Sequence, residues 1–211
     1  EKAEALSRSM DEAIRRAGTF LLSRQFARGY WCGELEVDTT VESDTLKLLH
    51  LLGRVDPTRQ ERLVRTILKN RLSDGGWSIY RGGPSELNAT VKAFVALRLS
   101  GRSAEDPILK RAAQTVRRLG GLERINSFEK VYLALFGLYP WDQVPALPPE
   151  VLLLPAWFPI NLYEISYWSR TILIPLSVVY GLRPSWVGAP FSVDELWVDP
   201  VRKRARITNF Q

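Results

Sequence analysis

The sequence contains one cysteine, Cys32, and one histidine, His50, the residue types best suited to metal or nucleophilic chemistry. A lone cysteine excludes a disulfide within the chain, so cysteine usage gives no sign of an oxidising compartment. Catalytic zinc takes about three protein ligands at suitable spacing, and the sequence shows no such cluster. His50 lies between Leu49 and Leu51, where packing or capping is the expected role of its imidazole. We therefore expect no metal and no cofactor.

Glycine and tryptophan form a second group of residues with a defined spacing. Residues Gln25–Trp31 (the first motif) have the form Gln, three residues, Gly, one residue, Trp, and Arg71–Trp77 (the second motif) repeat it with Arg in the place of Gln. The glycine lets the chain turn sharply out of a helix, and the tryptophan is expected to fold back over the helix end. The glutamine amide can bond free backbone groups at a helix end. The residues assigned to this structural role are Gln25, Gly29, Trp31, Gly75 and Trp77.

Composition excludes several other classes of protein. Of the 211 residues, 45% are hydrophobic and 25% charged, with a net charge of +6, which suits a globular domain with a substantial core. The basic residues are scattered along helix faces except near the end, at 202–206, and no basic helix carries interleaved aromatic residues. We therefore expect no nucleic-acid binding. The charged start, 1–16, is no signal peptide, and no uncharged apolar run approaches the roughly 18 residues of a membrane span.

The elements that position these residues are predicted to be helices in pairs. Asp56-Pro57 and Asp106-Pro107 are typical helix starts, 50 residues apart, and Thr40-Val41 and Thr90-Val91 recur at the same interval. Repeats of this size cannot bury an apolar face alone and must stack on neighbours. Because no run of alternating β-branched residues indicates a sheet, the predicted fold class is all-α.

Further helix boundaries follow from capping residues. A first helix carries a stripe through Leu6, Met10 and Ile14. Thr39 with Glu42 is the pattern of a capping box, and the helix after Asp56 is expected to stop at Gly75-Gly76. Asn126 or Ser127 is expected to begin another helix.

Beyond Tyr139, prolines break the chain into short pieces. Asn161 followed by Glu164 is expected to cap a longer helix that runs through Trp168 to about Tyr180, with a kink at Pro175. From Arg183 the chain has the composition of a connector. We therefore expect a helical-repeat region over 1–182 and a connector over 183–211 that leads to a further domain.

Taken in order, these segments resemble the triterpene cyclases, above all the bacterial squalene–hopene cyclases, and the resemblance covers essentially the whole chain. It implies an α/α toroid, here incomplete, in which glutamine–tryptophan motifs clamp the outer helices. The segments that carry it, besides the two motifs, are Gly29–Leu35, Gly82–Pro84, Gly120–Glu123, Tyr139–Trp141, Val144-Pro145, Pro148–Glu150, Asn161–Glu164 and Trp168–Arg170.

The resemblance also implies a function. The chain would be the N-terminal part of a class II polyprenyl cyclase, an isomerase of hopanoid or triterpenoid biosynthesis, and would form one wall of the cavity in which a linear isoprenoid such as squalene cyclises. Trp168 would present its ring to carbocations, a contact worth about 2 kcal/mol or more when desolvated; plain core packing is the alternative. Leu35, Asp44 and Ile165 would line the cavity or its polar end.

Two departures from the family pattern concern charge. The family protonates its substrate with an aspartate of an Asp-x-Asp-Asp motif in a second toroid, and these 211 residues contain no such motif. We expect no catalytic residue in this chain, no activity of this chain alone, and an acid supplied by a C-terminal cyclase domain. Lys92 and Asn126 stand where the resemblance leads us to expect Glu and Arg, so the charge pattern near the polar end is changed.

Other interpretations remain open at the level of sequence. The chain could be a stand-alone, non-catalytic α/α repeat that binds an apolar ligand or a partner protein. The related toroid of the protein prenyltransferases is disfavoured by the lack of zinc ligands. The resemblance implies a place on the cytoplasmic side of a bacterial-type membrane with monotopic contact. The apolar stretch Leu152–Ile160, with Trp157 and Phe158, would then lie near an access channel or form a packing loop.

Overall fold

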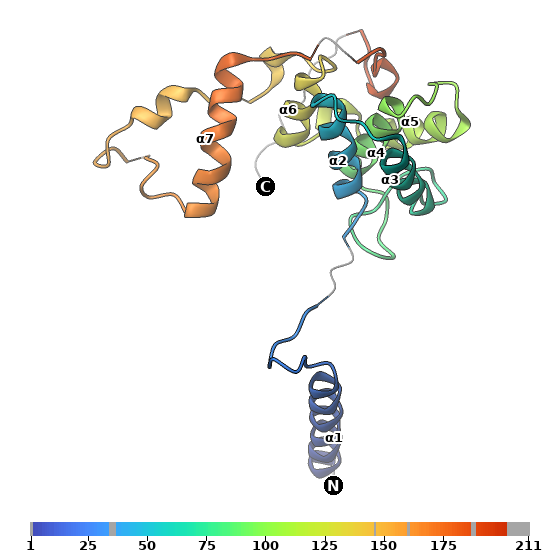
Figure 1. The fold of residues 1–211 in the computed structure, drawn as a ribbon, viewed down its shortest axis with the longest axis vertical. Helices are drawn as coiled ribbons and strands as arrows, with labels where there is room; N and C mark the ends of the chain where they lie inside the picture. The colour runs from blue at the N-terminus through green and yellow to red at the C-terminus, as the bar shows by residue number, and fades with distance from the viewer. Residues whose placement is uncertain (1, 34–36, 146, 160, 187–188, 202–211) are drawn as a thin grey trace. The chain divides into compact units, whose positions relative to one another are not determined.

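The structure is a computed structural model that describes residues 2–33, 37–145, 147–159, 161–186 and 189–201. All regular secondary structure in these ranges is helical, with seven α-helices and no strand (Figure 1). The expected all-α class is therefore confirmed. Contacts divide the chain into two compact units, 1–36 and 37–211.

The first unit consists of one long helix and the loop of the first motif. Helix α1 spans Lys2–Ser23, and its apolar stripe through Leu6, Met10 and Ile14 is exposed within this chain. After α1 the chain folds back, so that Trp31 contacts the end of this helix. Within this unit the described loop therefore leaves the apolar side of an amphipathic helix exposed.

The second unit is built around helix α4, Leu87–Leu99. Ten of its 13 residues are buried, so α4 has no solvated face of the usual width. It packs against α2, α5 and α3, and Phe94 and Leu97 are among its fully buried side chains. The other helices of the unit are α2 (Thr40–Leu51), α3 (Pro57–Lys69), α5 (Pro107–Leu119), α6 (Ser127–Leu135) and α7 (Tyr167–Leu182). Short 3-10 turns are η1 (Leu122–Arg124), η2 (Trp141–Gln143), η3 (Pro149–Leu153) and η4 (Asp194–Leu196).

Two of the predicted helix starts are confirmed by their hydrogen bonds. Asp56 accepts a bond from the Arg59 amide, and Asp106 accepts one from Ile108, in each case with proline as the first helical residue. A side chain in this position satisfies a backbone donor that the helix leaves free. Helix α3 ends at Lys69 rather than at the expected glycine pair. Helix α6 begins after its cap Asn126, as predicted.

The expected helix start at Thr39 is confirmed, because Thr39 is the N-cap of α2, but the expected capping box is wrong. The Thr39 side chain makes no capping bond, and the Asp38 carboxylate instead accepts from the Thr40 amide at 2.9 Å. An aspartate one residue earlier therefore accepts from the first amide of the helix, and the Thr39 hydroxyl makes none of the bonds of a capping box.

The expected helix start at Asn161 is also wrong. Helix α7 begins at Tyr167, capped by Ser166. Asn161 is buried, accepts from the amides of Tyr163 and Glu164, and donates to the Ala156 and Phe158 carbonyls. Because its amide has partners on both sides of the turn, Asn161 stabilises a loop and no helix follows directly.

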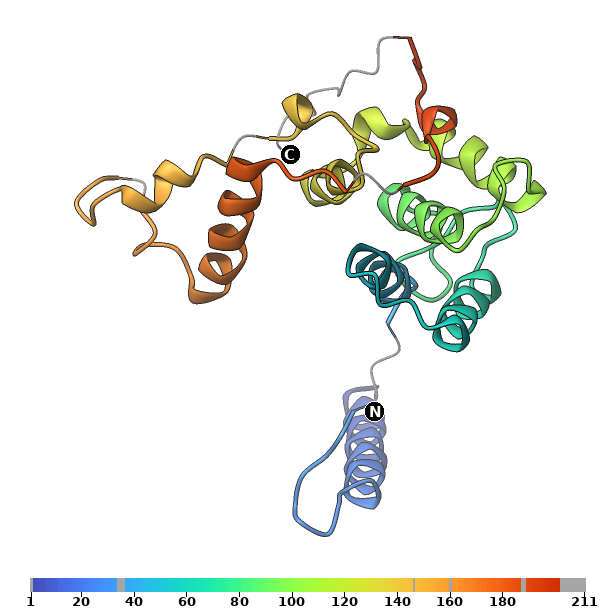
Figure 2. The ribbon, with the colours of Figure 1, turned by 45° about the horizontal axis from the view of Figure 1, so that its top comes forward.

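Part of the segment expected to be a connector packs on the core. Leu196 is fully buried, η4 lies against α5 (Figure 2), and Trp197 stacks on Tyr139 with ring centroids 5.4 Å apart. Glu123 accepts hydrogen bonds from the amides of Val198 and Asp199. Residues around 193–199 thus belong to the folded unit, while the division between a repeat region and a connector at residue 183 stays a prediction.

Candidate functional site

The two tryptophan motifs build the same local structure. The Trp31 indole Nε1 donates to the Leu21 carbonyl at 2.6 Å, and Trp77 Nε1 donates to the Ile67 carbonyl at 2.7 Å. Each indole reaches back ten residues to the last turns of the preceding helix, where carbonyls lack helical partners. Each motif therefore ties its own loop to a helix end.

The loops of the two motifs agree in their backbone as well. Gly29 and Gly75 have φ of 85° and 93°, a region that costs other residues energy and glycine little. In the first loop the Phe26 amide donates to the Tyr30 carbonyl at 2.9 Å, and in the second loop the Leu72 amide donates to the Gly76 carbonyl at the same distance. In the first motif the Gln25 amide also donates to the Gly29 carbonyl at 2.9 Å, so it closes its own loop.

The second motif is in addition fixed to the neighbouring helices. Trp77 is fully buried, whereas Trp31 is half exposed. Asp74 accepts from the Ser85 hydroxyl at 2.6 Å, from the Gly76 amide at 3.1 Å and from Arg118 of α5 at 2.5 Å. Burial acts to raise the pKa of Asp74, but these donors together hold the pKa below its usual value.

A cluster of charged side chains joins α2, α4 and α6. We call Asp44, Lys47, Lys92, Glu129 and Tyr132 the charged cluster. Its ammonium groups lie near two carboxylates: Lys47 is 2.9 Å from Asp44 and 3.3 Å from Glu129, and Lys92 is 2.5 Å from Asp44 and 4.0 Å from Glu129. The Tyr132 ring lies 4.9 Å from the Lys47 ammonium and 5.4 Å from that of Lys92.

The charged cluster is graded from buried to partly exposed. Lys47 and Glu129 are buried at 3% and 0% exposure, while the Lys92 and Asp44 side chains are 15% and 33% exposed. Burial raises the pKa of Glu129, against the opposing charges of the two lysines. Burial lowers the pKa of Lys92, but the bond and charge of Asp44 outweigh it, so that this pKa lies above its usual value.

The predicted cavity residues occupy different parts of the structure. Asp44 belongs to the charged cluster. Trp168 lies in the first turn of α7 and is 75% exposed in this chain, and Ile165 is half-buried in the loop before α7. Leu35 lies outside the described residues. The roles of these residues at a cavity stay predictions.

Sequence analysis missed Lys47 and Glu129. Lys47 stands among leucines three residues after Asp44, which places both on one helix face, and this spacing was the available signal. Glu129 reaches the site from a helix 82 residues away in sequence, so no local pattern could have indicated it.

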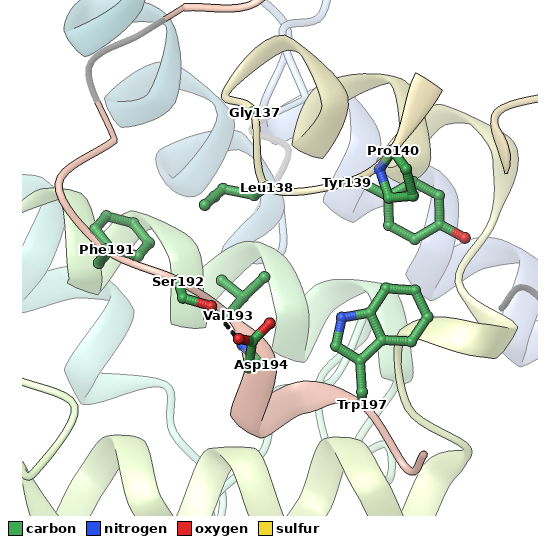
Figure 3. A pocket seen from close by; sticks show the side chains of 9 residues that line it. All are labelled: Gly137, Leu138, Tyr139, Pro140, Phe191, Ser192, Val193, Asp194 and Trp197. Carbon is green, nitrogen blue, oxygen red and sulfur yellow. Dashed lines mark hydrogen bonds between the residues drawn. The ribbon is translucent and has the colours of Figure 1, made fainter. Parts of the chain in front are cut away.

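The C-terminal part of the second unit contains several hollows among the described residues. A pocket of about 460 Å³ is lined by 137–140, 191–194 and Trp197; Figure 3 shows Tyr139 and Trp197 at one end and Phe191 at the other. Burial, with the charges of Glu123 and Asp142, raises the pKa of Tyr139 to about 12, so its phenol is neutral. A smaller, apolar hollow of about 200 Å³ lies between α6 and α7.

The described residues form neither a metal site of three or more ligands nor a membrane span. Within the described ranges, no group of three or more His, Cys, Asp or Glu side chains is placed to hold a metal ion. No described helix is both long and apolar enough to cross a membrane.

Paired helices, an all-helical core and two matching tryptophan motifs define a protein of the helical-repeat class, consistent with a helical toroid. A family model described as the squalene–hopene cyclase N-terminal domain matches residues 14–210. The squalene–hopene cyclase of Alicyclobacillus acidocaldarius is 36% identical over 98% of this chain and 30% of its own length. That of Zymomonas mobilis is 38% identical over 93% and 30%, and the dammaradiene synthase of Dryopteris crassirhizoma is 38% identical over 90% and 28%.

The chain therefore belongs to the squalene–hopene cyclase family and corresponds to its N-terminal domain. It spans less than a third of the length of these relatives.

Proposed function

We propose that this chain is part of a class II polyprenyl cyclase and forms one wall of the cavity in which a linear isoprenoid such as squalene is cyclised. The observation that carries the proposal is the family match over residues 14–210, together with relatives named as squalene–hopene cyclases and a dammaradiene synthase. The paired helices and tryptophan motifs supply the rigid wall that such a cavity requires.

In this reaction a proton adds to a terminal alkene, the resulting cation is attacked by successive alkenes, and the last cation loses a proton or takes up water. Protonating an alkene requires a strong, desolvated carboxylic acid. The 211 residues contain no Asp-x-Asp-Asp motif, so we assign the acid to the remainder of the protein. The role left to this chain is to exclude water and to stabilise positive charge.

Trp168 is the residue we assign to charge stabilisation. It stands in the first turn of α7 with 75% of its surface uncovered by this chain. An indole face is the best aromatic partner for a cation, and the contact is worth about 2 kcal/mol when water is excluded. A wall that presents this ring to the substrate would lower the energy of cationic intermediates that pass beside it.

The test compares Trp168→Ala with Tyr167→Ala in the full-length protein. The two residues are 75% and 77% exposed in this chain but point about 100° apart around the helix. We expect Trp168→Ala to lower turnover roughly tenfold or more and to release products of early termination, and Trp168→Phe to keep part of the activity. An unchanged rate and product profile in Trp168→Ala would remove Trp168 from the cavity.

We further propose that the protein sits peripherally on the cytoplasmic side of a membrane. Leu153 and Trp157, in and after η3, are 82% and 81% exposed, and tryptophan favours the interface between lipid and water. The measurement is sedimentation with liposomes: Trp157→Ser should weaken binding, with Tyr80→Ser, at another exposed aromatic, as the control. Equal binding of wild type and Trp157→Ser would contradict this contact.

A non-catalytic module that binds an apolar ligand is the second candidate, favoured by the apolar hollow between α6 and α7. The two functions differ in what the gene encodes after residue 211. An Asp-x-Asp-Asp motif there supports the cyclase, and a stop codon there supports the binding module.

A further inference from the structure

We propose that Glu123 and Trp197 are positioning residues for the cyclisation, because they hold the outer side of α6 through the chain that follows α7. We call the described residues 184–186 and 189–199 the C-terminal brace. This inference rests on the proposed function, since it concerns how the wall of the same cavity is kept in place. Both residues are assigned to act through α6 and not by contact with the substrate.

Helix α6 is the shortest α-helix described in the second unit. Its nine residues are too few for a helix that is stable by itself. It carries Glu129 and Tyr132 of the charged cluster, and Phe128 and Val131 at the apolar hollow beside α7. The positions of all these side chains therefore depend on the elements that hold α6.

The C-terminal brace is bonded to the chain at both ends of α6. Before the helix, the buried Glu123 carboxylate accepts from the Val198 amide at 3.0 Å and from the Asp199 amide at 2.8 Å. At its end, the Trp186 amide donates to the Leu135 carbonyl at 2.7 Å. One segment of the chain thus fixes the start and the end of the same short helix.

Two aromatic contacts add to these hydrogen bonds. Trp186 meets Phe136 edge to face, and Trp197 stacks on Tyr139, with ring centroids 5.4 Å apart in each pair; such pairs stabilise beyond the area they bury. The pocket of about 460 Å³ lies between 191–194 and 137–140, with Tyr139 and Trp197 at one end (Figure 3). Because the pocket separates the two segments there, the stacked pair and the Glu123 bonds carry much of the attachment.

The other side of the C-terminal brace is anchored to the core helices. Leu196 is fully buried, and Arg117 of α5 donates to the Glu195 carbonyl. The guanidinium of Arg98, in α4, lies over the Phe191 ring at 4.6 Å from its centroid. The brace therefore ties α6 to α4 and α5 from the outside.

The turn before α6 is shaped for this contact by Gly121. Its φ is 70°, which glycine adopts at little cost. A Cβ atom at this position would lie 2.8 Å from Val198 Cγ2 and 2.9 Å from the Val198 nitrogen. Only a residue without a side chain lets the brace approach the turn so closely.

A displacement of α6 is expected to affect the reaction more than substrate binding. Burial of a long isoprenoid is spread over the whole cavity, whereas each ring closure requires two reacting carbons to be aligned. A misplacement of about 1 Å can lower a rate on the order of a hundredfold. A loosened α6 should therefore allow cations to lose a proton before the cascade is complete.

The experiment measures kcat, KM and the ratio of products formed from squalene by the full-length protein. Glu123→Ala and Trp197→Ala are expected to lower kcat about tenfold or more, to raise the share of early-terminated products, and to leave KM within about twofold. Glu123→Gln and Trp197→Phe should lie between these variants and the wild type, because the amide oxygen and the smaller ring keep part of each contact.

The matched control is Asp56→Ala, which removes the cap of α3 and should leave the product ratio and the kcat per folded enzyme unchanged. A product ratio does not depend on the amount of folded enzyme, so a folding defect cannot imitate the expected result. Where an alanine variant does not fold, the Gln and Phe variants decide. The wild-type ratio and kcat in the folded variants would overturn the inference. A wild type that cyclises no linear isoprenoid contradicts the proposed function instead.

Discussion

At the scale of single residues, the tryptophans of the two motifs have different environments. Trp31 and Trp77 make the same bond to a carbonyl ten residues earlier, yet the first is half exposed and the second fully buried. The bond was predictable in outline from the spacing of glycine and tryptophan. The difference in burial was not, because it depends on which helices pack over each loop.

This difference predicts unequal costs for the same substitution. Trp77→Phe removes a buried N–H donor and leaves the Ile67 carbonyl without it, so we expect a loss of about 1–3 kcal/mol in the free energy of unfolding. Trp31→Phe should cost less than about 1 kcal/mol, since water can replace the lost donor at a half-exposed site. Chemical denaturation of both variants checks this, and equal losses would contradict it.

Asp74 links the second motif to its surroundings through a carboxylate, so its effect depends on pH. Its pKa lies below the usual 3.8, and a lowered native pKa means that the stabilisation is present above the unfolded-state pKa and is lost as the pH falls through the native pKa. Asp74→Asn should therefore reduce stability at pH 7 and flatten its decline on acidification below about pH 4.

The control for Asp74 is Glu61→Gln, which removes an exposed ion pair to Arg65 and should change stability by less than about 0.5 kcal/mol. Thermal unfolding across the acid range is the measurement. An acid-range slope in Asp74→Asn as steep as that of the wild type would show that this carboxylate does not carry the effect.

At the scale of elements, the sequence predicted helices best where a cap and a proline agree. Asp56-Pro57 and Asp106-Pro107 begin α3 and α5 as expected, because the side-chain acceptor and the fixed φ of proline favour the same start. Asn161 misled because asparagine favours turns as well as caps, and here its amide donates to the carbonyls of Ala156 and Phe158 in the same loop. Two members of the charged cluster, Lys47 and Glu129, escaped for a different reason, since the cluster brings together residues of three helices.

The helix caps predict different effects on stability for two substitutions. Asp56→Ala removes the acceptor of the Arg59 amide and should destabilise the protein by about 1 kcal/mol. Thr39→Val removes a buried hydroxyl that makes no hydrogen bond within the described residues and keeps the shape of the side chain, so it should be neutral or slightly stabilising. A larger loss in Thr39→Val than in Asp56→Ala would contradict the assignment of the caps.

At the scale of the whole molecule, the chain leaves much apolar surface uncovered. The apolar stripe of α1 is exposed in the first compact unit, and the aromatic residues around α7 are exposed in the second. The family match indicates that the relatives extend far beyond this length.

The 211-residue chain in isolation is therefore expected to associate or to bind a hydrophobic dye such as anilinonaphthalene sulfonate, because exposed apolar side chains favour association when they lie together. Sedimentation and dye fluorescence are the measurements, with the full-length protein as the control. A well-behaved monomer without dye binding would show that these surfaces do not need cover.

The most direct test of a cavity wall in this chain is photolabelling of the full-length protein with a linear isoprenoid that carries a photoreactive group, followed by peptide mapping. A wall formed by α2, α4, α6 and the first turn of α7 predicts label on peptides that contain Asp44, Lys92, Tyr132 or Trp168, reduced by excess squalene. Label confined to peptides outside residues 1–211, in protein that still cyclises its substrate, would contradict it.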